Sequence, residues 1–331
     1  MKPYRADFES DMRKLAISEL EKKRIKYKES DDVFELFLRF YTFLDRYIIP
    51  QKRKVYLSKE LQNGLGTKPE GIQEAVKKLA EWAESGVDIN CFQGRGLYGS
   101  GARDYQNSLY GIVHLHLSAR NTDKCPVIKK NGFAKPSDHL LYAKFTDEAA
   151  FFIDVVKHPE AIRNGGPIVT DWTSKRQFEI LVSNWPDLEK HGMIAGMEPC
   201  DPEGNPIDID DKTIAELVRN GITFPISIGK NTYFPTPGIA SSGDSCMAVL
   251  RANRICNQYK LAQKRFDESA DEICQKLSLI CVKSGAKIYF PFSFRLTFFQ
   301  GYNCPVIFEE KNGFIWNYQS NKWYSTKHQE C

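Results

Sequence analysis

Residues 110–117 read Tyr110-Gly111-Ile112-Val113-His114-Leu115-His116-Leu117 and carry the strongest structural signal in the chain. Apolar and polar side chains alternate along the second half of this stretch, and successive side chains of a β-strand point to opposite faces of the sheet. The alternation predicts a strand over residues 109–117, with the valine and the leucines on one face and His114 and His116 on the other. One face would be buried, and the other would present two imidazoles side by side.

Two further strands are expected after this one. Residues 138–145 and 150–157 are rich in apolar, β-branched and aromatic side chains, and the polar segment 146–149 between them has the composition of a hairpin turn. A helix is expected before them, because apolar residues recur at helical spacing between Pro69 and the stop signal at Gly86. We therefore expect residues 75–160 to form one antiparallel sheet of at least three strands packed on this helix.

The rest of the chain predicts two other units, which makes the fold class α+β. The first 68 residues read as helical, with the strongest apolar stripe directly after the N-cap candidates Ser30-Asp31-Asp32. Asn164-Gly165-Gly166-Pro167 is the best domain boundary, since two glycines and a proline end any regular element. We thus expect a helical N-terminal unit at 1–68, a small sheet domain at 69–163 and a separate C-terminal α+β domain at 167–331.

Within the C-terminal domain the apolar spacing indicates helices followed by aromatic-rich strands. The expected helices are 174–185, 214–219, 244–265 and 268–283, and the expected strands are 287–299, 306–309 and 314–318.

Composition excludes several classes of protein. A chain of 331 residues with 42% hydrophobic and 27% charged side chains has the composition of a globular protein. Its net charge of +4 is too small to indicate a nucleic-acid-binding protein by itself. No uncharged apolar run is long enough to span a membrane, and the nine cysteines form no regular framework. We expect a cytoplasmic protein with reduced cysteines, without a membrane partner, a metal or a cofactor.

The two histidines of the first strand are the main chemical signal. Spacing alone leaves three interpretations open, because same-face imidazoles serve as metal ligands, as acid and base groups, or as part of a polar sheet face. His158 follows the hairpin directly, and Asp154 lies close enough in the sequence to orient it.

The middle of the chain resembles the YafO family of ribosome-dependent mRNA interferases over residues 75–160. The features occur in the family's order: a helix ending in a Gly turn at 83–87, the segment 91–98, the His-Leu-His-Leu strand, the strand start 138–143, and the acidic hairpin 146–148. Beyond His158 the sequence departs from the family's pattern, which continues with a basic segment into a closing helix.

This resemblance implies a RelE-like fold, a small antiparallel sheet backed by helices, that cleaves mRNA in the ribosome without a metal. It implies a toxin or a stress or phage-defence effector of the toxin–antitoxin kind, with RNA, the ribosome and an antitoxin protein as partners. Cleavage through the RNA 2′-hydroxyl needs a base, an acid and cations that hold the phosphate. The candidate catalytic residues are His114, His116 and His158.

Candidate substrate-binding residues lie in the loops beside this strand. The arginines and lysines suit phosphate contacts, and Tyr98 either stacks on a base or packs on its own domain. The set is Arg95, Tyr98, Arg103, Arg120, Lys129, Lys130 and Lys157. The basic segment 120–135 is either an RNA-binding arm or a solvated loop. The acidic segment 201–211 is either a solvated loop or a built-in restraint on that arm.

Two other functions remain open from the sequence. One is a non-catalytic RNA- or protein-binding module that keeps the RelE-like fold, since a fold does not determine a function. The other is a metalloenzyme that uses the three candidate histidines as ligands.

Overall fold

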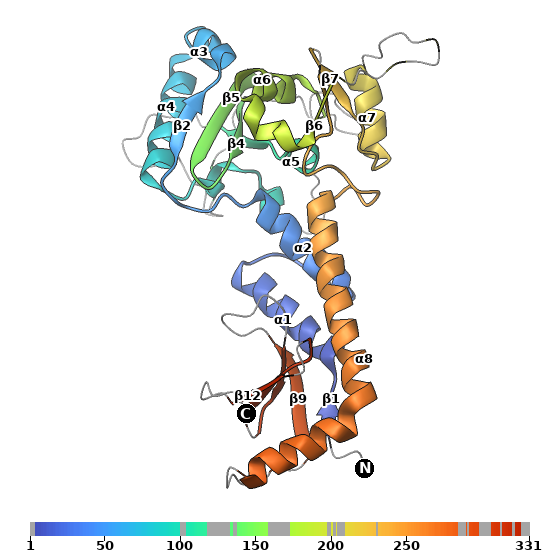
Figure 1. Cartoon of the computed structure of the whole chain (residues 1–331). Coiled ribbons are helices and arrows are strands. Elements are labelled where there is room, and N and C mark those ends of the chain that lie inside the picture. Colours follow the sequence, from blue (N-terminus) through green and yellow to red (C-terminus); the bar gives the residue numbers. More distant parts are fainter. Residues whose placement is uncertain are drawn as a thin grey trace. The chain divides into compact units, whose positions relative to one another are not determined.

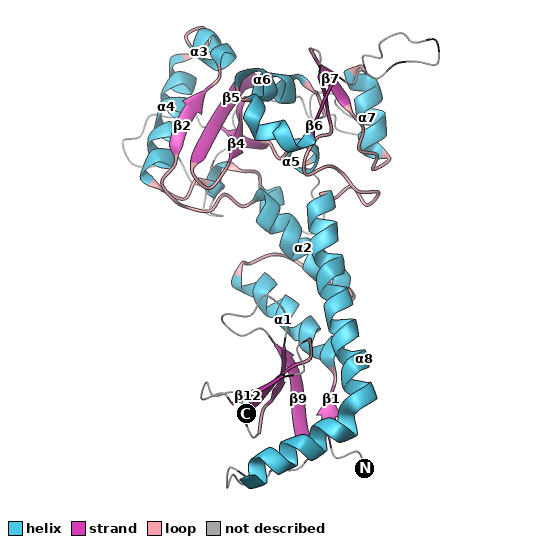
Figure 2. Cartoon of the chain, viewed as in Figure 1, coloured by secondary structure: helices cyan, strands magenta, loops and turns pink. Residues whose placement is uncertain are grey.

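The computed structural model describes residues 4–99, 104–117, 133–134, 138–157, 173–196, 209–229, 231–283, 291–297, 306–311, 313–319 and 322–325, with the single positions 200, 203 and 289. The chain divides into two compact units, one made of residues 1–41 with 250–331 and the other of residues 42–249. Both units mix helices and strands (Figures 1 and 2), so the α+β class is confirmed. No helix among the described residues is long and apolar enough to cross a membrane.

The first unit joins the two ends of the chain through one sheet. Its strands are β1 (Tyr4–Ala6), β9 (Phe292–Thr297), β10 (Val306–Glu309), β11 (Phe314–Asn317) and β12 (Lys322–Ser325), in the order β1-β9-β10-β11-β12. Helix α1 (Phe8–Lys22) and helix α8 (Cys246–Lys283), most of which belongs to this unit, supply its helical part. Phe266 of α8 packs between Phe8 and Phe294, with ring centroids 5.4 and 4.8 Å away.

The second unit is built on a four-stranded sheet with the order β2-β5-β4-β3. The strands are β2 (Lys54–Leu57), β3 (Val113–His116), β4 (His139–Phe145) and β5 (Ala149–Lys157). β3, β4 and β5 pair antiparallel, and β2 adds to β5 in parallel.

One face of this sheet is covered by α3 (Lys59–Leu65) and α4 (Glu70–Ser85). Ile72, Val76 and Leu79 of α4 are buried against Leu115 and the other apolar residues of β3, β4 and β5 on that face. α4 ends where it is expected to end, because Gly86 has φ of +82° and closes the helix in the left-handed conformation. The expected sheet of at least three antiparallel strands packed on this helix is confirmed.

The opposite face is covered by segments from later in the chain. These are α5 (Tyr105–Tyr110), α6 (Arg176–Asn184), α7 (Asp211–Arg219) and a small sheet of β6 (Met193–Ala195), β8 (Asn231–Tyr233) and β7 (Ile226–Ile228). Tyr110 stacks on Phe178 with ring centroids 4.9 Å apart, and Phe151 of β5 meets Trp185 at 5.0 Å. Figure 1 shows α6 on the side of this sheet away from α4.

The prediction that the first 68 residues are helical is wrong at two places, β1 and β2. Both strands are short, and each is held by a partner far along the chain: β1 pairs with β9 and β2 with β5. Local composition does not reveal a short strand whose pairing is remote. α2 (Val33–Arg46) starts after Asp32 as expected, and Asp32 caps it by accepting from the Glu35 N–H at 2.8 Å.

The observed units also differ from the predicted division at 164–167. That segment lies outside the described residues, but residues between Phe178 and Ile239 share one apolar core with α5, β4 and β5, and residues 42–249 form one compact unit that is distinct from the C-terminal strands. A Gly-Gly-Pro break ends regular elements, yet it does not stop the following helix from covering an apolar sheet face.

Two element boundaries are corrected as well. Residues 109 and 110 belong to α5, which ends at Gly111 with φ of +66°, so the strand starts later than the alternation indicates. The two helices expected at 244–265 and 268–283 are one continuous helix, α8.

A buried ion pair connects the four-stranded sheet of the 42–249 unit with the later segments of the chain that cover its second face. Lys144 of β4 pairs with Glu189, whose carboxyl group also accepts from Thr236 Oγ1 at 3.0 Å, and Lys144 Nζ donates to the Tyr110 carbonyl at 3.0 Å. The Glu189 side chain is 1% exposed. Losing one partner of such a pair leaves a buried charge without compensation.

We predict that Lys144→Met lowers the free energy of unfolding at pH 7 by about 3 kcal/mol, because it leaves the buried Glu189 carboxylate without its cationic partner. Chemical denaturation measures this loss. Lys78→Met is the matched control: its ion pair with Glu81 joins side chains that are 51% and 62% exposed, so the expected change is under about 0.5 kcal/mol. Equal effects of the two substitutions would contradict the buried connection.

Candidate active site

The two histidines of β3 lie together on the sheet face opposite α4. Val113 and Leu115 are buried toward α4, so His114 and His116 alternate to the other face, as predicted. Their ring centroids are 5.9 Å apart, and the planes of the two rings are nearly perpendicular, at 81°. Tyr142 lies directly opposite His114 in the sheet, with its ring centroid 6.3 Å away.

Asp104 brings a buried carboxylate to this pair. It is the N-cap of α5, and its Oδ1 accepts from the Asn107 N–H at 3.1 Å. Its Oδ2 lies 3.3 Å from His114 Nδ1 and 3.9 Å from Arg46 Nη2. All three side chains are largely buried, with exposures of 5% for Asp104, 14% for His114 and 8% for Arg46.

The surroundings of Asp104 keep it ionised. Burial acts to raise the pKa of the carboxyl group, but the interactions with His114 and Arg46 and the hydrogen bond from Asn107 outweigh it and bring the pKa down to about 2. The site therefore combines a buried anion with two neighbouring imidazoles.

Arg46 links this carboxylate to the loop in front of β3. It lies in the last turn of α2, and its Nη1 donates to the Gly96 carbonyl at 3.1 Å. Gln93 Nε2 donates to the Arg46 carbonyl and to Asn90 Oδ1, both at 2.9 Å. The buried Asn90 in turn accepts from the Ile48 N–H at 2.9 Å. This network fixes the loop 90–96 beside the histidines.

The loop passes close to His116. A Cβ placed on Gly94 would lie 3.8 Å from His116 Nε2, which is ordinary contact distance. The space in front of this nitrogen is therefore bounded by backbone, and a side chain longer than a methyl group at position 94 would occupy it. Tyr98, further along the loop, packs between Phe43 and Phe133 with ring centroids 5.5 and 5.7 Å away. Tyr98 therefore packs on its own domain, which is one of the two roles that the sequence left open.

Lys157 is not near the histidines. It pairs with His139 in the sheet, and it alternates with Val156 so that it falls on the same face as Val155, which packs toward α4. The register therefore assigns Lys157 to the sheet face opposite His114 and His116, and its phosphate-binding role stays a prediction. His139 is half-buried on the same face, where burial first, then Lys68 and Lys157, lower its pKa against an opposing effect of Asp138.

Several predicted site residues lie outside the described residues. They are His158, Arg103, Arg120, Lys129 and Lys130, together with the side chain of Arg95. Asp154, expected to orient His158, lies opposite Tyr142 on the histidine face, and its Oδ2 is 3.8 Å from Arg176 Nε.

Asp104, Arg46 and Tyr142 were missed by the sequence reasoning. Only Asp104 carries a local signal, because an Asp before a short helix is a typical N-cap. The position of Arg46 beside it depends on a contact between residues 58 positions apart, and that of Tyr142 depends on the strand register.

The acidic segment contributes helix caps where the structure describes it. Asp210 caps α7 by accepting from the Thr213 N–H at 2.7 Å. Asp211 accepts from Ser174 Oγ at 3.0 Å and from the Lys175 N–H at 3.1 Å, so it fixes the start of α6. These two carboxylates are therefore structural. The predicted restraint between residues 201–211 and 120–135 otherwise lies outside the described residues.

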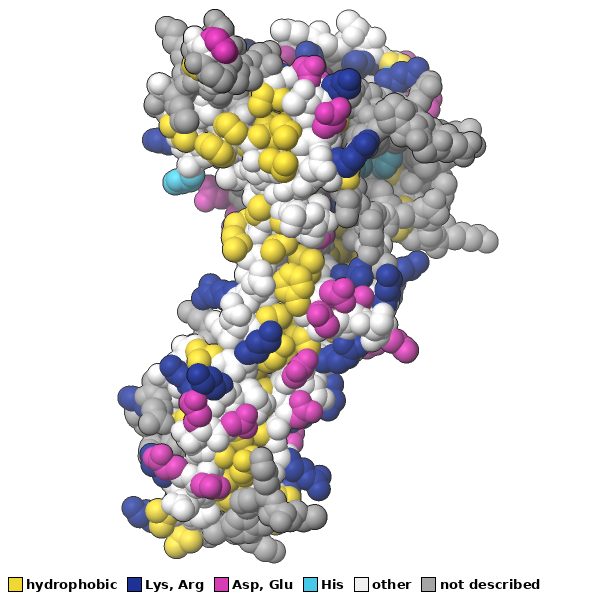
Figure 3. Space-filling view, turned by 90° about the vertical axis from the view of Figure 1, so that its right-hand side faces the viewer, with side chains coloured by type: hydrophobic (Ala, Val, Ile, Leu, Met, Phe, Trp, Pro, Cys, Tyr) yellow, Lys and Arg dark blue, Asp and Glu magenta, His cyan; other side chains and the backbone are white. Residues whose placement is uncertain are grey.

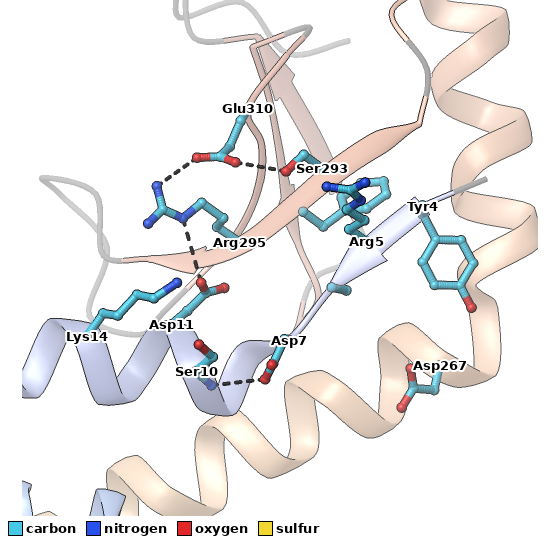
Figure 4. Close-up of a pocket in the computed structure, with 12 residues that line it drawn as sticks. Tyr4, Arg5, Asp7, Ser10, Asp11, Lys14, Asp267, Ser293, Arg295 and Glu310 are labelled. Carbon is cyan, nitrogen blue, oxygen red and sulfur yellow. Dashed lines mark hydrogen bonds and ion pairs between the residues drawn. The ribbon is translucent and has the colours of Figure 1, made fainter. Parts of the chain in front are cut away.

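A polar cavity in the other unit is the main competing site. It has a volume of about 570 Å³ and lies between β1, α1 and β9 (Figure 4). Three of its charged groups pair with one another: Arg295 Nη1 lies 2.7 Å from Glu310 Oε1, and its Nε lies 3.6 Å from Asp11 Oδ1. Asp11 also accepts from the Leu296 N–H at 3.0 Å. We interpret this cluster as a structural connection between α1 and the sheet.

The face in Figure 3 shows hydrophobic side chains among basic and acidic ones, with both signs interspersed. In the part of the chain that the structure describes, no group of three or more His, Cys, Asp and Glu side chains is placed to hold a metal ion.

Comparisons with protein-family models, curated proteins and solved structures found no match to this chain. The site geometry and the resemblance of the quoted motifs are therefore the grounds for a functional proposal.

We predict that Asp104→Asn destabilises the fold by about 2 kcal/mol at pH 7, which is the free energy that corresponds to lowering the pKa of Asp104 from 3.8 to about 2. Because the pKa is depressed in the folded chain, this stabilisation is complete above about pH 4 and is lost as the pH falls toward 2. Denaturant unfolding at several pH values measures the difference between the two proteins. A difference that stayed constant from pH 6 to pH 3 would contradict this origin of the stabilisation.

Proposed function

We propose that the chain is a ribosome-associated mRNA endoribonuclease that acts as a toxin or as a stress or phage-defence effector. In this proposal it cleaves RNA through the 2′-hydroxyl by acid–base catalysis without a metal. The observation that carries the proposal is the pair His114 and His116 on one sheet face, with His114 held against the buried carboxylate of Asp104.

The pair fits the chemistry of this reaction. The 2′-oxygen attacks the neighbouring phosphorus while a base takes the 2′-hydroxyl proton, and an acid gives a proton to the departing 5′-oxygen. Histidine performs both tasks near neutral pH. Two imidazoles whose centroids are 5.9 Å apart lie close enough to act on the two oxygens of one phosphodiester group.

The fold supports the same proposal. The YafO resemblance implies a RelE-like domain, a small antiparallel sheet backed by helices. Residues 54–157 combine the antiparallel strands β3, β4 and β5, to which β2 adds in parallel, with α3 and α4. Arg95 and the basic segment 120–135 are the cations that we assign to the RNA phosphates, in keeping with the dominant part that phosphate contacts have in RNA affinity. RNA and the ribosome are the proposed partners, with an antitoxin protein as a further one.

A second candidate function follows from the burial of the site. Asp104, His114 and Arg46 connect α5, β3 and α2, so the same cluster would serve to hold the domain together in a module that binds RNA or protein without cleaving. The ribosome assay below separates the two functions.

We predict that the purified chain cleaves mRNA only when translating ribosomes are present, and that His114→Gln and His116→Gln each lower the rate by about 10²–10⁴-fold, the usual contribution of a general acid or base. Primer extension on the mRNA measures the cleavage. His191→Gln is the matched control, since His191 is exposed and lies outside this cluster; its rate should equal that of the wild type.

The metalloenzyme alternative is tested in the same assay. Protein freed of metal by a chelator, which is then removed before the ribosomes are added, should keep its full rate. Loss of activity that Zn²⁺ restores would select the metalloenzyme, and ribosome binding without cleavage by the wild type would select the binding module.

A further inference from the structure

Asp104 is held in one orientation by two different partners. Its Oδ1 accepts from the Asn107 N–H as the cap of α5, so the carboxylate cannot turn without losing the cap. Its Oδ2 is thereby directed at His114 Nδ1, 3.3 Å away, and at the Arg46 guanidinium. Arg46 is itself anchored to the Gly96 carbonyl, so its distance to the carboxylate is set by the loop.

An anionic carboxylate next to Nδ1 determines where a neutral imidazole carries its proton. A carboxylate only accepts hydrogen bonds, so the nitrogen that faces it must be the protonated one. The proton of His114 then lies on Nδ1, and the lone pair lies on Nε2. A protonated Nε2 with a bare Nδ1 would place two acceptors against each other.

We propose that Asp104 is a positioning residue that fixes the tautomer of His114 and so makes His114 Nε2 the general base for the 2′-hydroxyl. This inference rests on the proposed function, and it assigns the roles of base and acid to particular histidines. His114 is the base because its tautomer is fixed by a carboxylate, and His116 is left as the acid.

The proton transfers balance in this scheme. His114 Nε2 takes the proton of the 2′-hydroxyl and becomes an imidazolium, whose charge the Asp104 carboxylate stabilises. The 2′-oxygen forms a bond to phosphorus, and the bond from phosphorus to the 5′-oxygen breaks. His116, protonated beforehand, gives its proton to that oxygen. The products are a 2′,3′-cyclic phosphate and a 5′-hydroxyl.

Among the residues that the structure describes, charged and titratable groups from four elements face His114. They are Asp104 at the start of α5, Arg46 of α2, His116 of the same strand and Tyr142 of β4. Of these only Asp104 is an anion near neutral pH, so its replacement isolates the effect of the carboxylate on the tautomer.

Asp104→Asn is a sharp test because the helix cap determines which way the new amide points. Asn caps helices about as well as Asp, and capping the Asn107 N–H requires the amide oxygen on that side. The NH₂ group then faces His114 Nδ1 as a donor, so Nδ1 must carry the lone pair and Nε2 the proton. The substitution is expected to invert the tautomer while the helix remains capped.

The experiment combines two readouts on the full chain. Imidazole ¹⁵N chemical shifts, assigned with a His114→Gln sample, show which nitrogen of His114 is protonated at a pH where the ring is neutral. Single-turnover cleavage on saturating ribosomes gives the rate of the chemical step. Asp210→Asn is the matched control, because Asp210 caps α7 in the same way and lies outside the histidine cluster.

We expect the Nδ1-protonated tautomer in the wild type and in Asp210→Asn, and the Nε2-protonated tautomer in Asp104→Asn. The cleavage rate of Asp104→Asn should fall by about 10²–10⁴-fold with unchanged ribosome affinity, because this is the usual contribution of a general base and the wrong tautomer removes that base; the corresponding Asp→Asn change in a Ser-His-Asp triad lowers kcat by about 10⁴-fold. A structural role alone would leave the cleavage rate of the folded variant unchanged even though the tautomer inverts.

Two outcomes would overturn the inference: an Nε2-protonated His114 in the wild type, which needs no variant to fold, or an inverted tautomer with an unchanged cleavage rate. If the tautomer follows the prediction but the wild type cleaves no RNA on ribosomes, the positioning contact stands and the proposed function fails.

Discussion

Both faces of the four-stranded sheet are apolar, and the need to cover both of them determines the architecture of residues 42–249. Leu115, Leu141 and Val155 point to one face, where α3 and α4 cover them. Leu140, Phe151 and Ile153 point to the other, where α5, α6 and α7 pack. At roughly 25 cal/mol for each Å² of apolar surface removed from water, leaving either face open would cost far more than a domain's net stability. The later segments are therefore part of this unit.

The candidate site lies at the edge of the sheet, where the contacts between the sheet and the covering segments are polar instead of apolar. β3 lies at the edge of the four-stranded sheet. Its two histidines are therefore next to a loop and to helix ends, and not at the centre of the apolar core. A helix N-cap and a helix C-terminal turn converge there, and they supply Asp104 and Arg46. Because each of these side chains is also held by the backbone, the carboxylate, the guanidinium and the imidazole keep fixed positions relative to one another.

The sequence predicted those features that depend on local patterns. Alternation placed His114 and His116 on one face, apolar spacing predicted α4, and the polar turn placed the hairpin of β4 and β5. Features that depend on remote contacts were missed. β2 is four residues long and is stabilised by pairing with a strand more than 90 positions later. Arg46 reaches Asp104 across 58 positions, so no window of sequence contains both partners. The Gly-Gly-Pro segment was overvalued as a boundary, because it says nothing about the apolar face of the helix that follows.

The chemical identity of the RNA ends tests the central claim most directly, because it reports on the reaction and not on the fold. If His114 and His116 act on the 2′-hydroxyl and the 5′-oxygen, mRNA cleaved on ribosomes carries a 2′,3′-cyclic phosphate or its 3′-phosphate product upstream and a 5′-hydroxyl downstream. Mass spectrometry of the fragments, with polynucleotide kinase labelling of the 5′ end, distinguishes these ends. Fragments with a 3′-hydroxyl and a 5′-phosphate would show that water is the nucleophile, and they would contradict the account.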